Sequence, residues 1–307
     1  MTHTIFIDGA AGTTGLEIVD RLAGRQEFEL LILNEEQRKS TAARRDAYHA
    51  ADFAVLCLPD EAAIEAVALA EGAKVRIIDA SSAHRTSAGW TYGFPELIGR
   101  DKVAAASRVS NPGCYPTGFL GLLAPLVRHG LLPADWPYTC HAVSGYSGGG
   151  KALIARFDDD SDIAFRDYGL TLGHKHVPEM QEYAGLAHAP VFGPAVIPAH
   201  RGMIVEVPLH LGLMARSAPT DGLRDFLADF YGTSPVVTVH AELPDELLLR
   251  ASAPPSDRLE LWVYGSRDGS QARLVARLDN LGKGASGAAV QSLNLMAGLD
   301  ETMGLTL

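Results

Sequence analysis

The sequence is short of several features that mark whole classes of protein. Its 307 residues include only three cysteines, Cys57, Cys114 and Cys140, an odd number in three different contexts, so we expect no disulfide framework. Positive charge is in deficit, with 26 Lys and Arg against 37 Asp and Glu. The net charge of −11 disfavours binding to nucleic acid or to acidic membranes, because the long-range field would repel both.

Long apolar runs are also missing. No stretch of about 18 uncharged apolar residues occurs, and no basic run followed by a long apolar segment opens the chain, so we expect neither a membrane span nor a signal peptide. A cytoplasmic location is then the default expectation. The composition, 47% hydrophobic and 21% charged, is typical of a soluble protein with two domains, and we expect its partner to be a small molecule.

The first hundred or so residues alternate short β-branched runs with amphipathic stretches, which is the pattern of βαβ units in a parallel sheet. Helical segments are expected after residue 15 and over 60–71. Strands are expected at 4–8, 28–33, 53–58 and 75–79. We therefore predict an α/β domain with a Rossmann-like, doubly wound parallel sheet.

After about residue 137 longer alternating runs predict a second, α+β domain with a mixed or antiparallel sheet. These runs lie at 203–207, 236–239 and 259–263. The proline-rich stretches 190–198 and 253–256 are expected to be loops. Residues 282–307 carry apolar side chains at helical spacing, so we expect this segment to pack back onto the first domain.

A glycine-rich turn joins the first strand to a helix. Glycines at positions 9, 12 and 15 would let the backbone approach a pyrophosphate, while the helix N-terminus supplies free N–H groups and a partial positive charge. The spacing G-x-x-G-x-x-G departs from the commoner G-x-G-x-x-G, and a purely structural turn is the alternative. The position of the turn in a βαβ unit favours nucleotide binding.

The residues after the second strand bear on the type of cofactor. Asn34 stands near the point where an acidic residue usually binds the ribose hydroxyls of NAD. Arg38 and Lys39 would suit a 2′-phosphate, which favours NADP. Glu35 and Glu36 blur this reading, and a solvated charged loop is the alternative.

Cys114 lies in the run Asn-Pro-Gly-Cys-Tyr-Pro-Thr, residues 111–117, just before an apolar helical face. Proline is favoured in the first turn of a helix, which places Cys114 at or just before the N-terminus. There the helix dipole and free N–H groups stabilise a thiolate, and also the oxyanion formed when it attacks a carbonyl. We predict that Cys114 is a nucleophile, whereas Cys57 and Cys140, in apolar strands, are structural.

Six stretches together resemble the N-acetyl-gamma-glutamyl-phosphate reductase family, in its shorter variety, over nearly the whole chain. They are residues 9–15, 79–85, 111–117, 144–151, 174–179 and 279–287. The resemblance to this branch of the semialdehyde dehydrogenase-like superfamily implies NADPH-dependent reduction of N-acetyl-glutamyl 5-phosphate through a Cys114 thioester. The products would be N-acetyl-glutamate 5-semialdehyde and phosphate, in arginine biosynthesis. The resemblance also implies a homodimer or a homotetramer.

The acid/base group of this chemistry is assigned to His174 or His176, with His176 slightly favoured. The alternative for either histidine is that it only orients the other. Because Val177 precedes a proline, we expect an extended backbone that points both rings the same way. Together with Glu179 they would also suit a metal, but no further ligands follow at readable spacing, so we expect no metal site.

The resemblance and the charges also suggest binding residues. The substrate contacts are assigned to Arg108, Asn111, Ser144, Ser147, Lys151 and Arg201. The cofactor contacts are assigned to Gly9, Gly12, Thr13, Thr14, Gly15, Arg38, Lys39, Ser81, Asn280, Gly284 and Gly287. Gly149 and Lys151 depart from the family pattern of alanine and arginine, and a lysine lacks the bidentate fork of arginine.

These assignments place NADP binding in residues 1–113 with 285–307, and catalysis, substrate binding and oligomerisation in residues 114–284. An aspartate-semialdehyde or aminoadipyl-phosphate reductase with the same covalent chemistry is the nearest rival, because a pocket not visible in the sequence sets the length of the substrate. Rivals of another class are a cysteine acyl hydrolase or transferase, and an NADP-sensing module.

Overall fold

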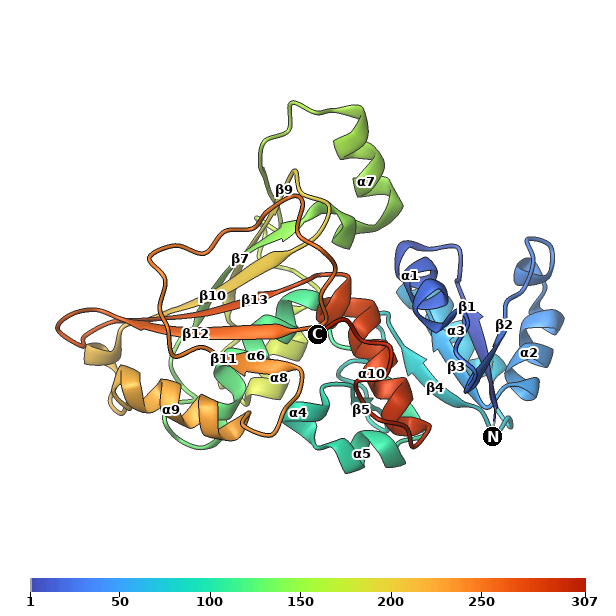
Figure 1. Ribbon diagram of the computed structural model, residues 1–307, viewed down its shortest axis with the longest axis horizontal. Coiled ribbons are helices and arrows are strands. Elements are labelled where there is room, and N and C mark those ends of the chain that lie inside the picture. The colour runs from blue at the N-terminus through green and yellow to red at the C-terminus, as the bar shows by residue number, and fades with distance from the viewer. Residues whose placement is uncertain (1) are drawn as a thin grey trace. The chain divides into compact units, whose positions relative to one another are not determined.

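The computed structural model describes residues 2–307, which form two compact units (Figure 1). The first unit ends at Pro112 and includes Ala285–Leu305, and the second comprises Gly113–Gly284 with Thr306–Leu307. Among the described residues, no helix is both long enough and apolar enough to cross a bilayer.

A parallel sheet of six strands forms the centre of the first unit. Its spatial order is β2 (Phe28–Leu31), β1 (His3–Asp8), β3 (Phe53–Leu56), β4 (Arg76–Asp79), β6 (Arg108–Ser110) and β5 (Thr91–Tyr92). The four predicted strands are present. Two of them end at Leu31 and Leu56, two residues early, so Cys57 follows β3 and does not lie within it as expected.

Helices cover both faces of this sheet, because alternate residues of its strands point to opposite sides. Ile5 and Ile7 join a buried cluster with α1 (Thr13–Leu22), α5 (Arg100–Ala105) and α10 (Gly287–Met296). Phe6 joins a second cluster with α2 (Thr41–Ala50) and α3 (Asp60–Leu69), and the short α4 (Pro95–Ile98) precedes α5. The predicted doubly wound architecture is confirmed, and α10 packs within this first unit.

The second unit is built on a mixed sheet of seven strands, as predicted. Its spatial order is β11 (Val237–Val239), β12 (Leu259–Gly265), β13 (Ala272–Leu278), β10 (Met203–Leu209), β7 (Thr139–Gly145), β9 (Val191–Ile197) and β8 (Arg166–Asp167). The pairs β7–β9 and β11–β12 are parallel, and the other neighbours are antiparallel.

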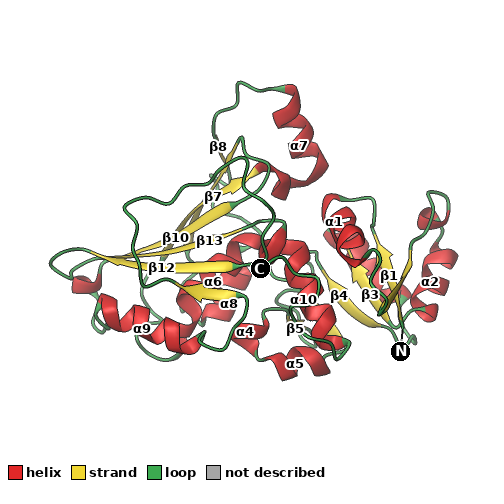
Figure 2. Cartoon of the chain, viewed as in Figure 1, coloured by secondary structure: helices red, strands yellow, loops and turns green. Residues whose placement is uncertain are grey.

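One face of this sheet packs on α6 (Cys114–Arg128) and α9 (Thr220–Phe230), and α8 (Val177–Ala184) packs on α6. The side chains that alternate with the core residues of β12 and β13, among them Glu260, Trp262 and Arg277, point to the other face. Figure 2 draws a long loop without helix or strand between β11 and β12, and α7 (Gly150–Asp159) projects at the opposite end of the unit from α9. The expected loop at 253–256 is part of that connection.

The loop expected at residues 190–198 is wrong, because this stretch forms β9. β9 pairs along its whole length with β7, whereas β8 pairs only with Ala195 and Val196. On this edge the Pro194 carbonyl oxygen accepts the Tyr168 N–H at 3.4 Å, but Pro194 has no paired residue on β8, which is a position that tolerates a proline. The prediction of a loop gave the prolines too much weight and the neighbouring valine and isoleucine residues, which favour a strand, too little.

Candidate active site

The nucleophile predicted from the sequence is the first residue of α6. Gly113 is the N-cap, with an extended backbone, and Cys114 behind it is half-buried and in no disulfide. Thr117 donates its N–H and its hydroxyl to the carbonyl oxygen of Gly113, both at 2.9 Å, which closes the first turn. The thiol therefore lies at the positive end of a helix of 15 residues. The predicted position of Cys114 is confirmed.

A buried carboxylate fixes this turn from the neighbouring helix. Glu179, in the first turn of α8 and 1% exposed, accepts a hydrogen bond from the Gly113 N–H at 3.1 Å. The start of α8 is thereby held against the start of α6. A carboxylate in this position also complements the partial positive charge at both helix N-termini.

The two histidines lie next to each other at the start of α8. Their ring centroids are 4.7 Å apart, and His174 Nδ1 accepts the backbone N–H of His176 at 3.2 Å. The neutral His174 ring therefore carries its proton on Nε2. The expected extended backbone is wrong, because His176 is a helical N-cap and Pro178 lies in the first turn, where its missing N–H costs nothing.

Two tyrosines complete the surroundings of the nucleophile. Tyr168 donates its hydroxyl to the Tyr115 oxygen at 3.3 Å, and Tyr115 donates to the Ala195 carbonyl oxygen at 3.1 Å. Burial raises the pKa of Tyr168 to about 12, and negative charge on Cys114 also raises it. Burial likewise raises the pKa of Tyr115. Both phenols are therefore neutral at any physiological pH, and each already donates its proton to the partner named above.

The segment after β13 packs directly against the cysteine. A Cβ atom on Gly284 would lie 2.9 Å from the Cys114 Cβ, so only glycine fits there. The Asp279 carbonyl oxygen accepts the N–H groups of Gly282 and Gly284, and the Asp279 carboxylate binds Arg201 at 2.9 Å. The backbone of this loop is thus fixed on one side by the nucleophile and on the other by an ion pair.

The first unit carries a separate cradle at the carboxyl end of β1. A Cβ on Gly9 would lie 2.3 Å from the Cys57 carbonyl oxygen, and one on Gly15 would lie 2.4 Å from the Gly9 oxygen, so the fold itself requires both glycines. A Cβ on Gly12 would meet nothing closer than 3.4 Å. Gly12 is the N-cap of α1, and its missing side chain leaves the helix N-terminus open to a phosphate.

A cavity of about 270 Å³ adjoins this turn. Its lining includes Gly9, Ala11, Ile32 and Leu33, together with the positively charged Arg38. An apolar slot beside a glycine turn, with a positive charge in its lining, fits the adenosine end of a dinucleotide. These residues therefore fit the nicotinamide cofactor that the sequence suggested.

Three comparisons with known proteins bear on this arrangement. A family model described as "Semialdehyde dehydrogenase, NAD binding domain" matches residues 4–106, and one described as "Semialdehyde dehydrogenase, dimerisation domain" matches residues 114–280. N-acetyl-gamma-glutamyl-phosphate reductase 2 from Nostoc sp. is 47% identical, with 98% of each chain covered. N-acetyl-gamma-glutamyl-phosphate reductase from Rhizobium etli is 48% identical, over 96% of this chain and 99% of the relative.

The chain belongs to the N-acetyl-gamma-glutamyl-phosphate reductase family. It is an oxidoreductase whose first unit is a nicotinamide-binding domain. Solved structures of aspartate semialdehyde dehydrogenases share the fold. The enzyme II from Vibrio cholerae has a TM-score of 0.72 at 17% identity, over 97% of this chain and 99% of that one. The enzyme from Francisella tularensis has a TM-score of 0.71 at 14% identity, over 96% and 100%.

Among the residues expected to take part in this family's chemistry, the structure gathers one group in the second unit. Cys114, His174, His176 and Gly284 lie around the N-termini of α6 and α8. Ser147 accepts the Asn280 amide N–H at 2.9 Å, and the Asn280 oxygen accepts the Gly202 N–H at 2.9 Å. This amide braces the Ser144–Ser147 segment in the second unit, whereas Gly287 begins α10 in the first.

The other expected contacts come from several different elements. Lys39 is exposed, pairs with Glu35 at 3.5 Å and does not line the cavity that Arg38 reaches. Arg108 is exposed at the start of β6, over the ring of Trp90, while Asn111 follows the other end of that strand. Lys151 is exposed in the first turn of α7. Thr13 and Thr14 begin α1 behind Gly12.

Asp79, His84 and Arg85 were given no role in the sequence analysis, although they share the stretch 79–85 with Ser81. Asp79, fully buried, accepts the N–H and the hydroxyl of Ser81 and the Nδ1 of His84 at 2.6 Å. Arg85, also buried, donates Nε to the Asn111 carbonyl oxygen at 3.0 Å. All lie within the stretch 79–85, so its match to the family pattern was the available signal. No metal-binding group of three or more His, Cys, Asp or Glu occurs among residues 2–307.

The remaining cysteines behave as packing groups. Cys140 is fully buried in β7, and burial raises its pKa. Burial raises the pKa of Cys57 to about 12, and the nearby carboxylates of Asp79 and Asp8 also raise it. Neither thiol is therefore available as a thiolate at neutral pH.

Proposed function

We propose that this chain catalyses the NADPH-dependent reduction of N-acetyl-glutamyl 5-phosphate to N-acetyl-glutamate 5-semialdehyde with release of phosphate, in arginine biosynthesis. The observation that carries the proposal is Cys114 at the N-terminus of α6, braced by Glu179 beside two imidazoles. The names of the relatives at 47–48% identity supply the substrate. The cytoplasmic location and the assembly as a homodimer or homotetramer belong to the same proposal.

In this mechanism the Cys114 sulfur attacks the acyl carbon, and the bond to the phosphate oxygen breaks with its electron pair. The first-turn N–H groups of α6 stabilise the oxyanion of the tetrahedral intermediate. Lys151 and Arg201 are the cations assigned to the anionic groups of the substrate. Phosphate leaves, and a thioester on Cys114 remains.

The nicotinamide, when bound, supplies the hydride that reduces the thioester. His176 donates a proton to the substrate oxygen and takes it back when the carbon–sulfur bond breaks and the aldehyde forms. His174 is the positioning residue, because its Nδ1 is already committed to the His176 backbone. Gly284 leaves room for the thioester by presenting no side chain to Cys114.

The choice of NADP over NAD rests on Arg38, which lines the cavity beside the glycine turn. Its guanidinium would pair with a 2′-phosphate. Arg38 now forms an ion pair with Glu35 at 3.3 Å. This pair is exposed and therefore weak, so a doubly charged phosphate would displace Glu35 from Arg38. The substrate groups assigned in residues 114–284 and the cofactor groups in 1–113 with 285–307 are part of the same proposal.

The test follows the reaction in reverse, which avoids the unstable acyl phosphate. Phosphate-dependent reduction of NADP and of NAD is measured with N-acetyl-glutamate semialdehyde, for the wild type, Cys114→Ala and the control Cys57→Ala. We expect activity with NADP that Cys114→Ala abolishes and Cys57→Ala retains. Activity only with aspartate semialdehyde, run in parallel, would move the substrate assignment, and phosphate-independent turnover would reject the mechanism.

A further inference from the structure

The cavity beside the glycine turn is also lined by Asp8, the last residue of β1. Its side chain lies on the same face of the sheet as Phe6, toward α2 and α3, because alternate residues of a strand point to opposite sides. Asp8 is only 4% exposed, and no step of the proposed reaction uses it. A buried carboxylate is costly unless it is paired and hydrogen-bonded, so the partners of Asp8 indicate its role.

All the donors that reach this carboxylate converge on one of its two oxygens. Arg44 of α2 donates Nε and Nη2 to Asp8 Oδ2 at 3.1 and 2.9 Å, and Tyr48 donates its hydroxyl to the same oxygen at 2.6 Å. Burial raises the pKa of Tyr48 and the negative charge of Asp8 raises it further, so the phenol stays a donor. Because Arg44 and Tyr48 are themselves buried, the orientation of the Asp8 side chain is fixed.

The other oxygen, Asp8 Oδ1, receives no hydrogen bond from any of residues 2–307. It is not among the unbonded polar atoms that are sealed from solvent, so the small exposed part of Asp8 includes Oδ1. A carboxylate oxygen accepts hydrogen bonds and cannot donate them. The cavity therefore offers a fixed acceptor to a ligand that brings a hydroxyl or an amino group.

Arg44 also makes a carboxylate compatible with an anionic ligand at this position. An unpaired carboxylate next to the turn 9–15 would repel a pyrophosphate. The Arg44 guanidinium neutralises Asp8, and its Nη1 reaches Glu65 of α3 at 3.3 Å. Glu65 is exposed, so solvent screens its charge. Asp8 can thus act as an acceptor without opposing the phosphates.

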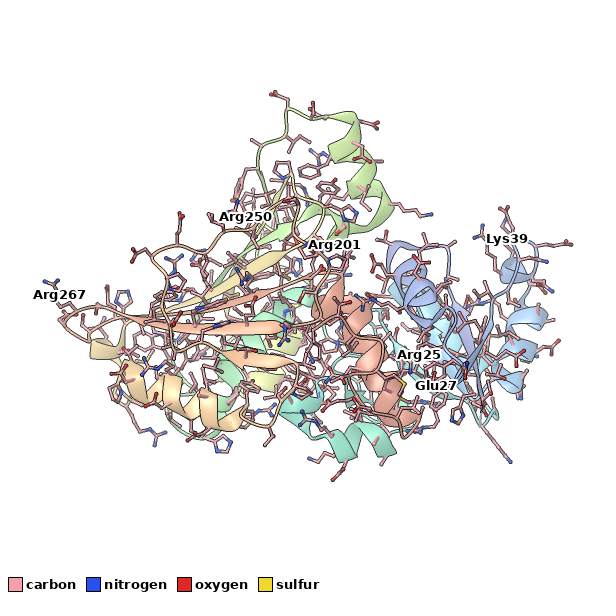
Figure 3. All side chains as sticks on the ribbon, in the orientation of Figure 1. Arg25, Glu27, Lys39, Arg201, Arg250 and Arg267 are labelled. Atoms are coloured by element: carbon pink, nitrogen blue, oxygen red, sulfur yellow. The ribbon has the colours of Figure 1, made fainter. Side chains whose placement is uncertain are left out.

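The chemistry of the cofactor indicates which group Oδ1 accepts, and this step rests on the proposed use of NADP. The 2′-oxygen of NADP carries phosphate, so the donors left on its adenosine are the 3′-hydroxyl and the 6-amino group. Arg38, proposed for the 2′-phosphate, lines the same cavity, in the short helix that ends at Lys39, labelled in Figure 3. Asp8 directly precedes Gly9, and the ribose is bonded to the pyrophosphate, whereas the amino group lies at the far end of the base.

We propose that Asp8 Oδ1 accepts a hydrogen bond from the 3′-hydroxyl of the adenosine ribose, and that Arg44 and Tyr48 are positioning residues that hold the carboxylate for it. Asp8 thereby takes the role usual for an acidic residue after the second strand, where this chain has Asn34. The acid and the cation Arg38 then contact different oxygens of the ribose, so hydroxyl recognition and a 2′-phosphate are compatible.

The first measurement compares nucleotides on the wild-type, full-length protein and needs no variant. Competition with bound NADPH, followed by its fluorescence, gives the affinities of AMP, 3′-deoxy-AMP and 2′-deoxy-AMP. We expect 3′-deoxy-AMP to bind about tenfold more weakly than AMP, because it lacks the donor to a charged acceptor, and 2′-deoxy-AMP to bind within about twofold of AMP. Equal affinities of AMP and 3′-deoxy-AMP, or a loss with 2′-deoxy-AMP instead, would overturn the proposal.

The variant Asp8→Asn exchanges the free acceptor for a donor. Its amide oxygen would keep the hydrogen bonds of Arg44 and Tyr48, which turns the NH2 group toward the cavity. We expect AMP and 3′-deoxy-AMP to bind this variant equally, and NADPH to bind about tenfold more weakly than to the wild type. Asp20→Asn, an exposed position on α1 outside the cavity, is the matched control and should keep the wild-type affinities. A preference for AMP that persists in Asp8→Asn, folded by circular dichroism, would assign the hydroxyl to another acceptor.

The positioning role has a readout of its own. Tyr48→Phe removes one of the three donors to Asp8 and keeps the ring, so the ratio of the AMP and 3′-deoxy-AMP affinities should fall. A general loss of stability would not change this ratio, and an unchanged ratio would remove Tyr48 from the proposal.

None of these affinities depends on turnover. If the wild type binds NADPH and discriminates against 3′-deoxy-AMP but does not reduce NADP with N-acetyl-glutamate semialdehyde, the proposed reaction is wrong and the role of Asp8 is supported. If it binds neither NADPH nor AMP, the cofactor site is wrong and the role of Asp8 is overturned with it.

Discussion

At the scale of single residues, the turn that carries Cys114, the proposed nucleophile, is bonded to a carboxylate of another helix. Glu179 accepts the Gly113 N–H at 3.1 Å and is 1% exposed. Removal of its side chain leaves a buried N–H without an acceptor, which costs about 1–3 kcal/mol. We expect Glu179→Ala to lower the free energy of unfolding by this amount, measured by urea denaturation.

The conservative variant Glu179→Gln keeps an acceptor oxygen, so it should restore most of the stability while the negative charge is lost. Glu182→Ala, an exposed position on the same helix, is the control and should change stability by less than about 0.5 kcal/mol. If Glu179→Ala and Glu182→Ala unfold at the same urea concentration, the brace has no energetic role.

The two histidines differ in what their ring nitrogens already bind. His174 uses Nδ1 to hold the His176 N–H, whereas His176 is buried at the N-cap of α8. We expect His176→Asn to lower kcat by about 10²–10⁴-fold with little change in melting temperature, because it removes a proton donor. His174→Asn should lower kcat less than tenfold and lower the melting temperature. The opposite pattern in steady-state assays and thermal scans would exchange the two roles.

The sequence predicted those parts of this site that depend on neighbouring residues in the chain, and missed those that depend on residues far apart in it. Cys114 was predictable because the prolines around it place a helix start, and that placement needs no tertiary contact. Glu179, Tyr168 and Arg85 form hydrogen bonds with Gly113, Tyr115 and Asn111, respectively, in the run 111–117. These partners are 26–66 positions apart in the sequence, and no spacing rule predicts such contacts. Arg108 begins β6 and lies over the Trp90 ring, a contact that its charge alone did not indicate.

At the scale of elements, the glycines of the turn 9–15 differ in function: the fold requires Gly9 and Gly15, whereas Gly12 leaves room for a ligand. Gly9 has φ of +89°, and a Cβ there would collide with the Cys57 backbone at 2.3 Å. Gly12 has an ordinary extended backbone, and a Cβ atom added there would lie no closer than 3.4 Å to any other atom. We expect Gly12→Ala to change the free energy of unfolding by about 1 kcal/mol or less, because alanine is only slightly worse at an N-cap.

The same variant should weaken NADPH binding at least tenfold, measured by the fluorescence of the bound nucleotide, since the added methyl group fills the space that a pyrophosphate would take. Gly15→Ala is the contrasting case. Its Cβ would lie 2.4 Å from the Gly9 oxygen, so it should lose stability and binding together. Unchanged NADPH affinity in Gly12→Ala would remove the turn from the cofactor site.

Element types were predictable where the period of apolar residues was clear, and failed where a single residue type decided the reading. The four strands expected in the first unit are present and differ only at their ends, whereas the two short strands β5 and β6 were not predicted. At 190–198 the prolines suggested a loop, although strand pairing on one edge is compatible with Pro194. At 174–178 the proline suggested extended backbone, although the same residue is favoured in a helical first turn.

At the scale of the whole molecule, burial of tyrosines ties stability to alkaline pH. Burial raises the pKa of Tyr168 to about 12 and of Tyr183 to about 12, and it raises those of Tyr48, Tyr115 and Tyr138 as well. An unfolded tyrosine ionises near pH 10. The folded state thus holds these protons more tightly than the unfolded state does.

The sign of the effect follows from this difference. Below about pH 10 both states keep the protons and stability is unaffected, whereas between pH 10 and 12 unfolding releases them and the free energy of unfolding falls with pH. The slope is up to about 1.4 kcal/mol per pH unit for each such tyrosine. We expect absorbance at 295 nm to show only part of the nine tyrosines ionising in the native protein at pH 11, and the rest on unfolding in urea. Tyr168→Phe should reduce the pH dependence of the urea midpoint by the contribution of one tyrosine. If all nine tyrosines titrate near pH 10 before the protein unfolds, the buried phenols beside Cys114 are contradicted.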